Sequence, residues 1–176
     1  MTARLSILGI TILIGSAGVA QSGEQRWEAG TELGAVHTMG SNPIFGSAGE
    51  IEGGLLRRIG ERWGAGGLVR YRHVIDAAPA SAFWYGDVEA CGQFRPWRRL
   101  SLRLEAGCSW RHIGIAGYSN TVGGVVVGGQ VGVDLVTWHH WDLGVVALLH
   151  VTQTWPTVET FRTDEVGLAL RAVFAR

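Results

Sequence analysis

Hydrophobic and polar residues alternate along most of this chain after Arg26. In 100–110, LSLRLEAGCSW, the even positions are apolar and the odd positions include Arg103 and Glu105. The same period of two recurs in 123–151, GGVVVGGQVGVDLVTWHHWDLGVVALLHV, and in the last segment of the chain. Because successive side chains of a β-strand point to opposite faces, this pattern predicts strands with one apolar and one ionic face.

Turn-forming residues divide the chain into eight such runs. We predict strands at 26–37, 48–59, 63–75, 83–95, 100–111, 121–136, 141–154 and 160–174. The connections alternate between short ones, such as TWHH, and mostly longer ones that are rich in Gly, Pro, Ser and Asn. This layout predicts an all-β fold, an eight-stranded antiparallel up-and-down transmembrane β-barrel whose two ends have different surroundings.

The tryptophans indicate which face of the strands meets lipid. Following the chain up and down, five fall at the short-turn end and three at the long-loop end, and none is expected in the middle of a strand. Trp and Tyr favour the two membrane–water interfaces, so we predict two interfacial belts with lipid outside the barrel. A soluble lipocalin-like carrier, with the apolar face inside, is the alternative interpretation of the same alternation. The predicted belts consist of Trp27, Trp63, Trp97, Trp138 and Trp141 at one end and Trp84, Trp110 and Trp155 at the other.

The ionic face then lines the barrel lumen. An eight-stranded lumen is just wide enough for side chains to fill it, and an unpaired buried charge costs several kcal/mol. We therefore predict a lumen plugged by ion pairs, for example Glu50 or Glu52 with Arg70 or Arg72, and Asp87 or Glu89 with Arg103. A narrow ion channel remains an alternative. The predicted network is Glu50, Glu52, Arg70, Arg72, Asp87, Glu89, Arg103, Glu105, Asp134, Glu165 and Arg171, and the same face carries Glu28, Glu32, Arg58, Asp142 and His150.

The first residues have the composition of a secretory signal peptide. Arg4 precedes an apolar run from Leu5 to Ile14, and Gly18-Val19-Ala20 has the small-x-small pattern of a cleavage site. The apolar run is about half the ~20 residues that a membrane-spanning helix needs. We predict a signal peptide over 1–20, which is removed on export, and a barrel domain over 21–176.

Charge and cysteine content narrow the possible functions. The formal net charge is zero, which gives no electrostatic footprint for nucleic acid, and all 15 basic residues are arginines. The two cysteines fall on opposite faces by parity, Cys91 on the ionic face and Cys108 on the apolar face. Side chains on opposite faces cannot reach disulfide geometry, so two free thiols are expected.

These features together resemble the small outer-membrane β-barrel proteins of Gram-negative-type bacteria, which include the transmembrane domain of outer-membrane protein A and the outer-membrane X and W proteins. The resemblance covers 26–176 and is architectural, without a motif diagnostic of one member. It implies outer-membrane lipid as the surroundings and the barrel-insertion machinery as a partner during assembly. Members of the family end in an aromatic residue that serves as an assembly signal; here Phe174 is third from the end, before Ala175 and Arg176.

Candidate chemistry is sparse. Some barrels of this size are lipid A deacylases that use a Ser, a His and an acid, and the segment RHIGIAGYSNT offers His112, Ser119 and Asn120, with Glu105 or Glu89 below. The deacylase pattern resembles His-x-Ser-Asn, whereas here Gly117 stands two positions before Ser119. The adjacent histidines of the TWHH turn lack further nearby metal ligands, and the glycines form no phosphate loop. We assign no catalytic, cofactor-binding or metal-binding residue.

The sequence thus predicts a non-enzymatic, porin-like outer-membrane barrel with a structural, adhesive or envelope-maintenance role. That role is expected of the outer loops at 38–47, 76–82, 112–120 and 155–160, whose partner the sequence does not identify. A lipid A-modifying enzyme and a narrow channel are the alternatives.

Overall fold

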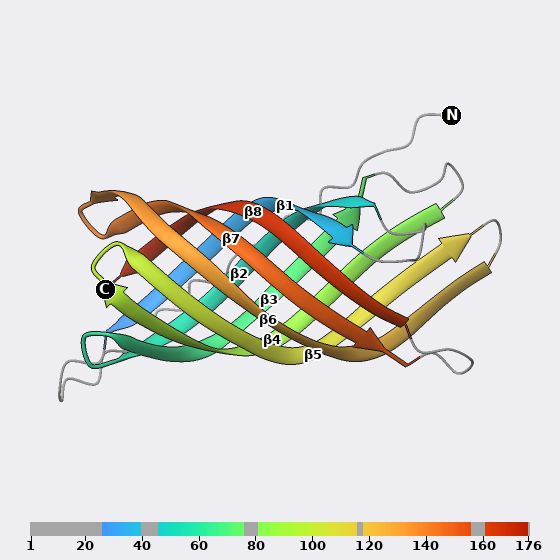
Figure 1. The fold of residues 1–176 in the computed structure, drawn as a ribbon, viewed down its shortest axis with the longest axis horizontal. Coiled ribbons are helices and arrows are strands. Elements are labelled where there is room, and N and C mark those ends of the chain that lie inside the picture. Colours follow the sequence, from blue (N-terminus) through green and yellow to red (C-terminus); the bar gives the residue numbers. More distant parts are fainter. Residues whose placement is uncertain (1–25, 40–45, 76–80, 116–117, 156–160, 176) are drawn as a thin grey trace.

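Eight antiparallel strands close into a single barrel in the computed structural model, which describes residues 26–39, 46–75, 81–115, 118–155 and 161–175 (Figure 1). Each strand pairs with its neighbours in sequence, and β1 pairs with β8 to close the ring. The strands are β1 (Trp27–Met39), β2 (Ser47–Ile59), β3 (Trp63–Val74), β4 (Ser81–Trp97), β5 (Leu100–Ile115), β6 (Tyr118–Trp138), β7 (Trp141–Thr154) and β8 (Phe161–Ala175). The predicted all-β, eight-stranded up-and-down architecture is confirmed.

The two ends of the barrel differ, as the connection lengths predict. The β2–β3, β4–β5 and β6–β7 turns lie together at one end, here called the short-turn end, with the last residues of β8 (Figure 1). Two of these turns use left-handed backbone, at Gly60 (φ 73°) and at His139 (φ 54°). The other end is called the long-loop end. Residues 1–25, which include the predicted signal peptide, and 40–45, 76–80, 116–117, 156–160 and 176 lie outside the described residues.

One expected loop is mostly strand. Residues 112–120 were expected to form an outer loop, but β5 continues to Ile115 and β6 begins at Tyr118. Backbone pairing continues with His112 opposite Thr121 and Gly114 opposite Ser119. Glycines and serines in this segment suggested a loop, yet cross-strand hydrogen bonds outweigh their weak strand propensity.

Two irregularities bend the wall at the short-turn end. The β4–β5 register shifts between Phe94 and Trp97, a stretch that contains Pro96, which has no N–H to donate to a partner strand. The β6–β7 register shifts between Asp134 and Val136, so that Leu135 is the extra residue. Both bulges lie next to tight turns, where they end the regular alternation of faces.

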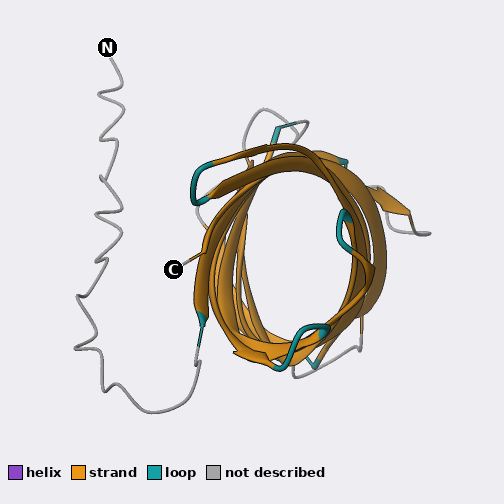
Figure 2. Ribbon diagram, turned by 90° about the vertical axis from the view of Figure 1, so that its left-hand side faces the viewer, coloured by secondary structure: helices purple, strands orange, loops and turns teal. Residues whose placement is uncertain are grey.

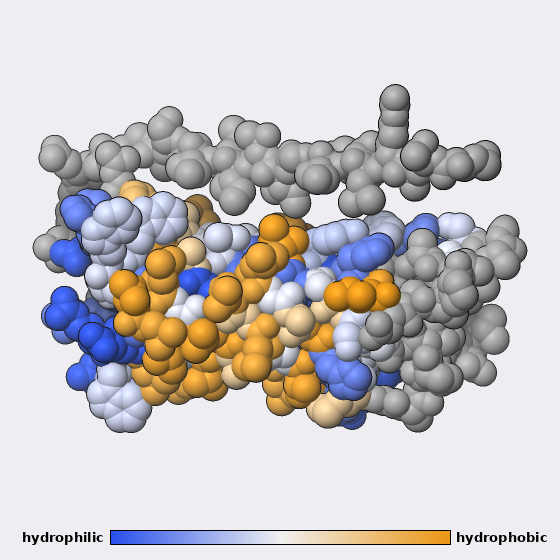
Figure 3. Space-filling model, turned by 90° about the horizontal axis from the view of Figure 1, so that it is seen from above, coloured by the Kyte–Doolittle hydropathy of each residue, from blue (hydrophilic) through white to orange (hydrophobic). Residues whose placement is uncertain are grey.

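The outer wall is apolar and the inside is polar, so the barrel is the reverse of a soluble protein. Leu104, Leu168 and Leu170 are 75%, 71% and 67% exposed, whereas Arg70, Arg72 and Glu165 are at most 1% exposed. On the face seen in Figure 3, apolar side chains gather along the middle of the barrel. No described helix is long and apolar enough to cross a membrane. The exposed apolar band identifies the lipid-facing surface of a transmembrane barrel.

Candidate functional site: the lumen

The lumen has three layers along the barrel axis. Near the long-loop end, Val36, Ala48, Val74, Tyr85 and Leu148 form one apolar cluster, and toward the short-turn end Leu56, Leu68 and Cys91 form another. The ion pairs centred on Arg70 and Arg72 lie between these clusters. Alternation produces the layers directly, because the inward residues of β2 run Ala48, Glu50, Glu52, Gly54, Leu56 and those of β3 run Val74, Arg72, Arg70, Leu68.

Arg70 holds the centre of the ionic layer. Its Nη2 donates to Glu52 Oε2 at 2.5 Å and to Glu105 Oε2 at 2.9 Å, and its Nη1 donates to Glu89. Its Nε lies 3.5 Å from Glu50 Oε2. One guanidinium therefore ties together acids from three strands, β2, β4 and β5, in a lumen closed to solvent on all sides of this side chain.

Arg72 links the same side of the barrel to β8. Its Nε donates to Glu50 at 2.5 Å and its Nη1 to Asp87 at 3.0 Å, with Glu165 Oε2 2.9 Å from Nη1. Nearer the long-loop end, Arg111 lies over the ring of Tyr85, 4.9 Å from its centroid, and 3.9 Å from Glu165. The pairs thus cross the lumen as well as joining neighbouring strands.

Arg103 joins β5 to the opposite wall. It donates to Glu105 (2.5 Å), Gln130 (2.6 Å), Glu32 (3.2 Å) and Glu52. This differs from the expected pairing of Arg103 with Asp87 or Glu89, which are held by Arg72 and Arg70 instead. The register explains the difference, because Arg103 lies opposite Gln93, four residues along β4 from Glu89.

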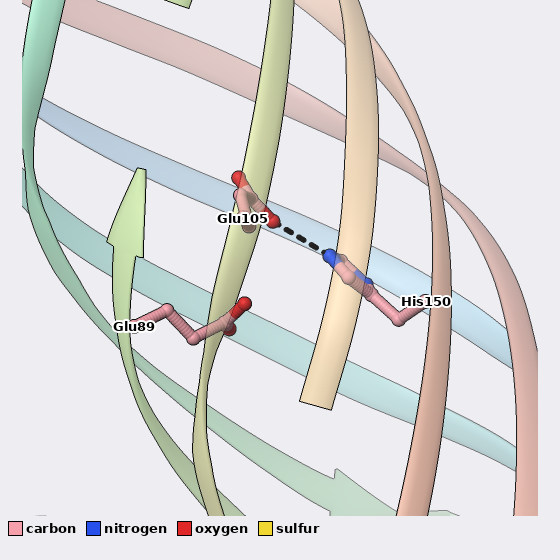
Figure 4. A group of neighbouring side chains, drawn as sticks. All are labelled: Glu89, Glu105 and His150. Atoms are coloured by element: carbon pink, nitrogen blue, oxygen red, sulfur yellow. Dashed lines mark hydrogen bonds and ion pairs between the residues drawn. The ribbon is translucent and has the colours of Figure 1, made fainter. Parts of the chain in front are cut away.

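His150 has its tautomer fixed by two neighbours. Its Nδ1 lies 3.1 Å from Arg72 Nη2, and a guanidinium can only donate, so Nδ1 is the acceptor. The proton is then on Nε2, which donates to Glu105 Oε2 at 2.7 Å (Figure 4). The neutral imidazole therefore connects an arginine of β3 to a glutamate of β5.

Glu89, Glu105 and His150 are the described group with the spacing of metal ligands, since one ligand atom from each lies within 4.8 Å of the others (Figure 4). Both ring nitrogens of His150 are already hydrogen-bonded, and Arg70 bridges the two carboxylates. A cation at this place would have to displace Arg70. We therefore treat the three residues as part of the ion-pair network.

Two smaller groups lie toward the short-turn end. Arg171 of β8 donates to Asp134 at 2.5 Å and to Ser101 at 2.8 Å. Glu28 of β1 accepts from Arg95 at 3.0 Å and lies 3.3 Å from Arg58. Asp142, which was expected on the lumen face, accepts from Thr137 at the β6–β7 turn (2.7 Å) and is only half-buried.

A cavity beside Glu32, Glu52 and Arg103 leaves about 20 Å³ for the centre of a water-sized sphere. One water molecule needs roughly 10–15 Å³ by this measure. The layer thus has room for about one water here, and the view along the barrel in Figure 2 shows the ring of strands that encloses it.

Sequence reasoning omitted several lumen residues. Arg95 and Arg111 are 9% and 2% exposed and belong to the network, and Gln93 and Gln130 are buried beside them. Arg95 is an even number of residues from Asp87 on β4, and Arg111 is an even number of residues from Arg103 on β5. Strand alternation therefore places both arginines on the lumen face. They were omitted because the predicted strands ended at those two residues.

The outer surface has the predicted tryptophans at different depths. At the short-turn end Trp27, Trp63 and Trp141 begin their strands, and Trp97 and Trp138 end theirs. Trp155 follows β7 directly, but Trp84 and Trp110 lie inside β4 and β5, because both strands extend beyond their predicted ends. Phe174 packs on Trp141, with ring centroids 5.2 Å apart. The cysteines lie on opposite faces, with Cys91 buried in the lumen, Cys108 exposed outside, and both free.

Ser119 does meet a histidine, across the sheet. The Oγ of Ser119 lies 3.3 Å from His112 Nε2, and His112 Nδ1 lies 3.0 Å from Thr121 Oγ1. Sequence spacing missed this contact because it compared positions within one strand, whereas β5 supplies the histidine to β6. Glu89 and Glu105 lie inside the barrel, on the other side of the wall, so neither of the expected acids contacts His112.

No protein-family model and no curated protein sequence matches this chain. The attachment invasion locus protein Ail of Yersinia pestis, solved with the heparin analogue sucrose octasulfate, aligns over 86% of this chain and 99% of its own, with 11% identity and a TM-score of 0.62. Neisserial surface protein A aligns over 85% of this chain and 96% of its own, with 13% identity and a TM-score of 0.58.

A third similar structure is the N-terminal β-barrel domain of Pseudomonas aeruginosa OprF, which aligns over 82% of this chain and 96% of its own (10% identity, TM-score 0.50). At these identities the likeness concerns the fold. The predicted resemblance is confirmed at that level: the chain has the fold of the small eight-stranded outer-membrane β-barrel proteins.

Proposed function

We propose that this protein is an outer-membrane barrel that stays closed to ions and acts through its long-loop end, in adhesion or envelope maintenance. The layered lumen is the observation that carries the proposal. An ion would have to pass two apolar clusters and a layer in which Arg70, Arg72 and Arg103 are each held by several partners. Moving those side chains would leave buried charges unpaired, at a cost of several kcal/mol each.

Planar-bilayer recording tests the closed lumen. The purified barrel should give no discrete conductance steps, while a wide porin in the same bilayers serves as the positive control. Insertion is checked on the same preparation with a heat-modifiability gel, because folded and boiled small barrels migrate differently. Discrete steps from a preparation that is fully folded would contradict the proposal and favour the narrow channel.

The role of the long-loop end is tested on cells. Replacing 156–160 by a Gly-Ser linker of equal length should leave the folded band intact and reduce attachment of expressing cells to host-cell or abiotic surfaces. A Gly-Ser exchange at the His139–His140 turn, on the opposite end of the barrel, is the control. The Ail structure contains a heparin analogue, but here Arg162 at this end is paired with Asp164 (3.0 Å), so we do not extend sulfated-sugar binding to this chain. Equal attachment by both variants would argue for a purely structural role.

Hydrolysis of lipid esters is a second candidate, and the contact between Ser119 and His112 favours it. A serine hydroxyl within reach of an imidazole nitrogen, here on the outer surface near the long-loop end, is the minimum for nucleophilic attack. A matched pair exists on the other side of the barrel, where Ser47 Oγ lies 3.3 Å from His37 Nδ1. Loss of lipid A or phospholipid hydrolysis in Ser119→Ala but not in Ser47→Ala would support an enzyme. An unchanged lipid profile on overexpression of the wild type would exclude it.

The assembly role of Phe174 is also part of the proposal. Its place beside Trp141 at the end of β8 is compatible with either an interfacial anchor or a recognition signal. Phe174→Ala should slow insertion by the barrel-insertion machinery in cells much more than spontaneous folding into detergent. Equal slowing in both assays would indicate an anchor alone.

A further inference from the structure

The short-turn end carries an arc of exposed arginines on its outer surface. Arg62 lies in the β2–β3 turn, Arg98 and Arg99 form the β4–β5 turn, and Arg57 lies on the outer face of β2, all exposed. None of these four arginines forms an ion pair with another described residue, and the exposed acid among these turns is Glu61. This concentration of unpaired positive charge is a feature that the closed-barrel function does not use.

The position of Arg57 indicates what the arc faces. Along the outer face of β2, Arg57 lies between Leu55 (50% exposed) and Ile59 (58% exposed), and in register it lies opposite Trp27. Its guanidinium is therefore on the lipid-facing side at the depth of the aromatic belt, which is the depth of lipid headgroups. A guanidinium at that depth favours an anionic headgroup, because no acid among the described residues pairs with Arg57.

Tryptophans accompany the other members of the arc. Trp63 follows Arg62 and Trp97 precedes Arg98, and these rings are 58% and 70% exposed. Hydrophilic side chains at this end border directly on the apolar band (Figure 3). Guanidinium groups bind phosphate oxygens in a bidentate manner, and neighbouring indole rings fix their depth in the interface.

We propose that this basic arc is a binding surface for the phosphate groups of anionic phospholipids in the leaflet that surrounds the short-turn end. Among the described residues, the long-loop rim has no such group of unpaired arginines, since its exposed Arg162 is neutralised by Asp164. The two rims of the barrel therefore differ in charge. This difference favours placing the short-turn end in the leaflet that contains anionic phospholipids. Zwitterionic phospholipids also carry a phosphate, but the ammonium of their headgroup offsets its charge, so they attract the four guanidinium groups less strongly.

Brominated lipids test the proposal, with the rim tryptophans as the reporter. Dibromo-phosphatidylglycerol should quench tryptophan fluorescence more strongly than dibromo-phosphatidylcholine when each is mixed with unlabelled phosphatidylcholine. The preference should fall as salt screens the headgroup charge. Replacing Arg57, Arg62, Arg98 and Arg99 by Gln should weaken this preference. The ratio of the binding constants for the two lipids should fall about fivefold for each arginine that binds a phosphate.

Controls make each outcome decisive. Arg162→Gln, on the opposite rim, should keep the full preference, and both brominated lipids must quench in every variant, which shows that the barrel is in the bilayer. Equal quenching of the wild type by the two lipids would overturn the proposal. A preference that survives in the fourfold variant would do the same, as would tight binding of a soluble polyanion by the arc with no lipid preference. None of these results bears on whether the lumen conducts.

Discussion

At the scale of single residues, Arg70 is the side chain whose loss should cost most. It is 1% exposed and neutralises carboxylates from three strands. Arg70→Met keeps much of the volume but leaves buried charges uncompensated, so we expect the free energy of unfolding to fall by about 3–5 kcal/mol. Urea unfolding of the barrel in phosphatidylcholine vesicles, followed by gel shift, measures the change.

Arg162→Met is the matched control for this prediction, because the side chain is 63% exposed and its single partner is Asp164. An exposed pair contributes about 0–1 kcal/mol. If the two variants unfolded at the same urea concentration, the ionic layer would contribute no more than a surface pair.

Gly128 should be intolerant of a side chain. A Cβ at this position would overlap the ring of His150, which lies opposite it in register. The ring is held between Arg72 and Glu105 and cannot move without breaking a hydrogen bond. We expect Gly128→Ala to lower the free energy of unfolding by about 1–3 kcal/mol. Gly53→Ala, which meets no atom within 4 Å, should be neutral in the same urea titration, and equal losses in both would point to backbone effects alone.

At the scale of strands, the two native cysteines allow a test of which face of the strands meets lipid. Cys91 points into the lumen and Cys108 points to lipid. Nitroxide labels on the single-cysteine variants Cys108→Ala and Cys91→Ala should therefore differ. We expect dissolved oxygen, which concentrates in the bilayer, to relax the label at 108 strongly and the label at 91 weakly. The opposite order would mean that the ionic face meets lipid.

The face of each strand was predictable from the sequence, whereas the ion pairs were not. Alternation places Arg103 on the lumen face whatever the exact register, provided that the strand shifts by an even number of residues. Such a shift keeps each side chain on its face but changes the residues that lie opposite it. The pairing of Arg103 with Glu32, Glu52 and Glu105 depends on that register. Contacts across the lumen, such as that of Arg72 with Glu165 of β8, depend further on closure of the ring.

Strand ends were harder to predict for a different reason. Turn residues indicated loops at 112–120, but strands that protrude beyond the bilayer can pair with each other in water and need no apolar outer face there. The contact of His112 with Ser119 arises in this protruding part. Composition therefore locates the membrane-spanning part of each strand better than its end.

At the scale of the whole molecule, the wall and the lumen depend on each other. Lipid outside removes any hydrophobic core from the centre, so cohesion inside the barrel comes from ion pairs enclosed by two small apolar clusters. Backbone hydrogen bonds between all eight strand pairs leave the closed ring with no free edge. The barrel should therefore unfold as one unit, and its stability should depend on the membrane that surrounds it.

The height of the apolar band predicts which membrane fits best. On β7 the outward residues from Leu143 to Val151 are apolar, between Trp141 and Gln153. At ~3.4 Å per residue this stretch is about 30 Å long, and a strand tilt of about 40° reduces its height to roughly 23 Å. Each Å of mismatch costs a fraction of a kcal/mol, because the bilayer must stretch or thin around the barrel. We expect the temperature at which the folded gel band disappears to be highest in phosphatidylcholine vesicles with a hydrocarbon core near this height, and lower in both thinner and thicker ones. A midpoint that rises steadily with acyl-chain length would place the lipid boundary beyond Gln153 and Trp155, and the aromatic belts would then not mark the interfaces.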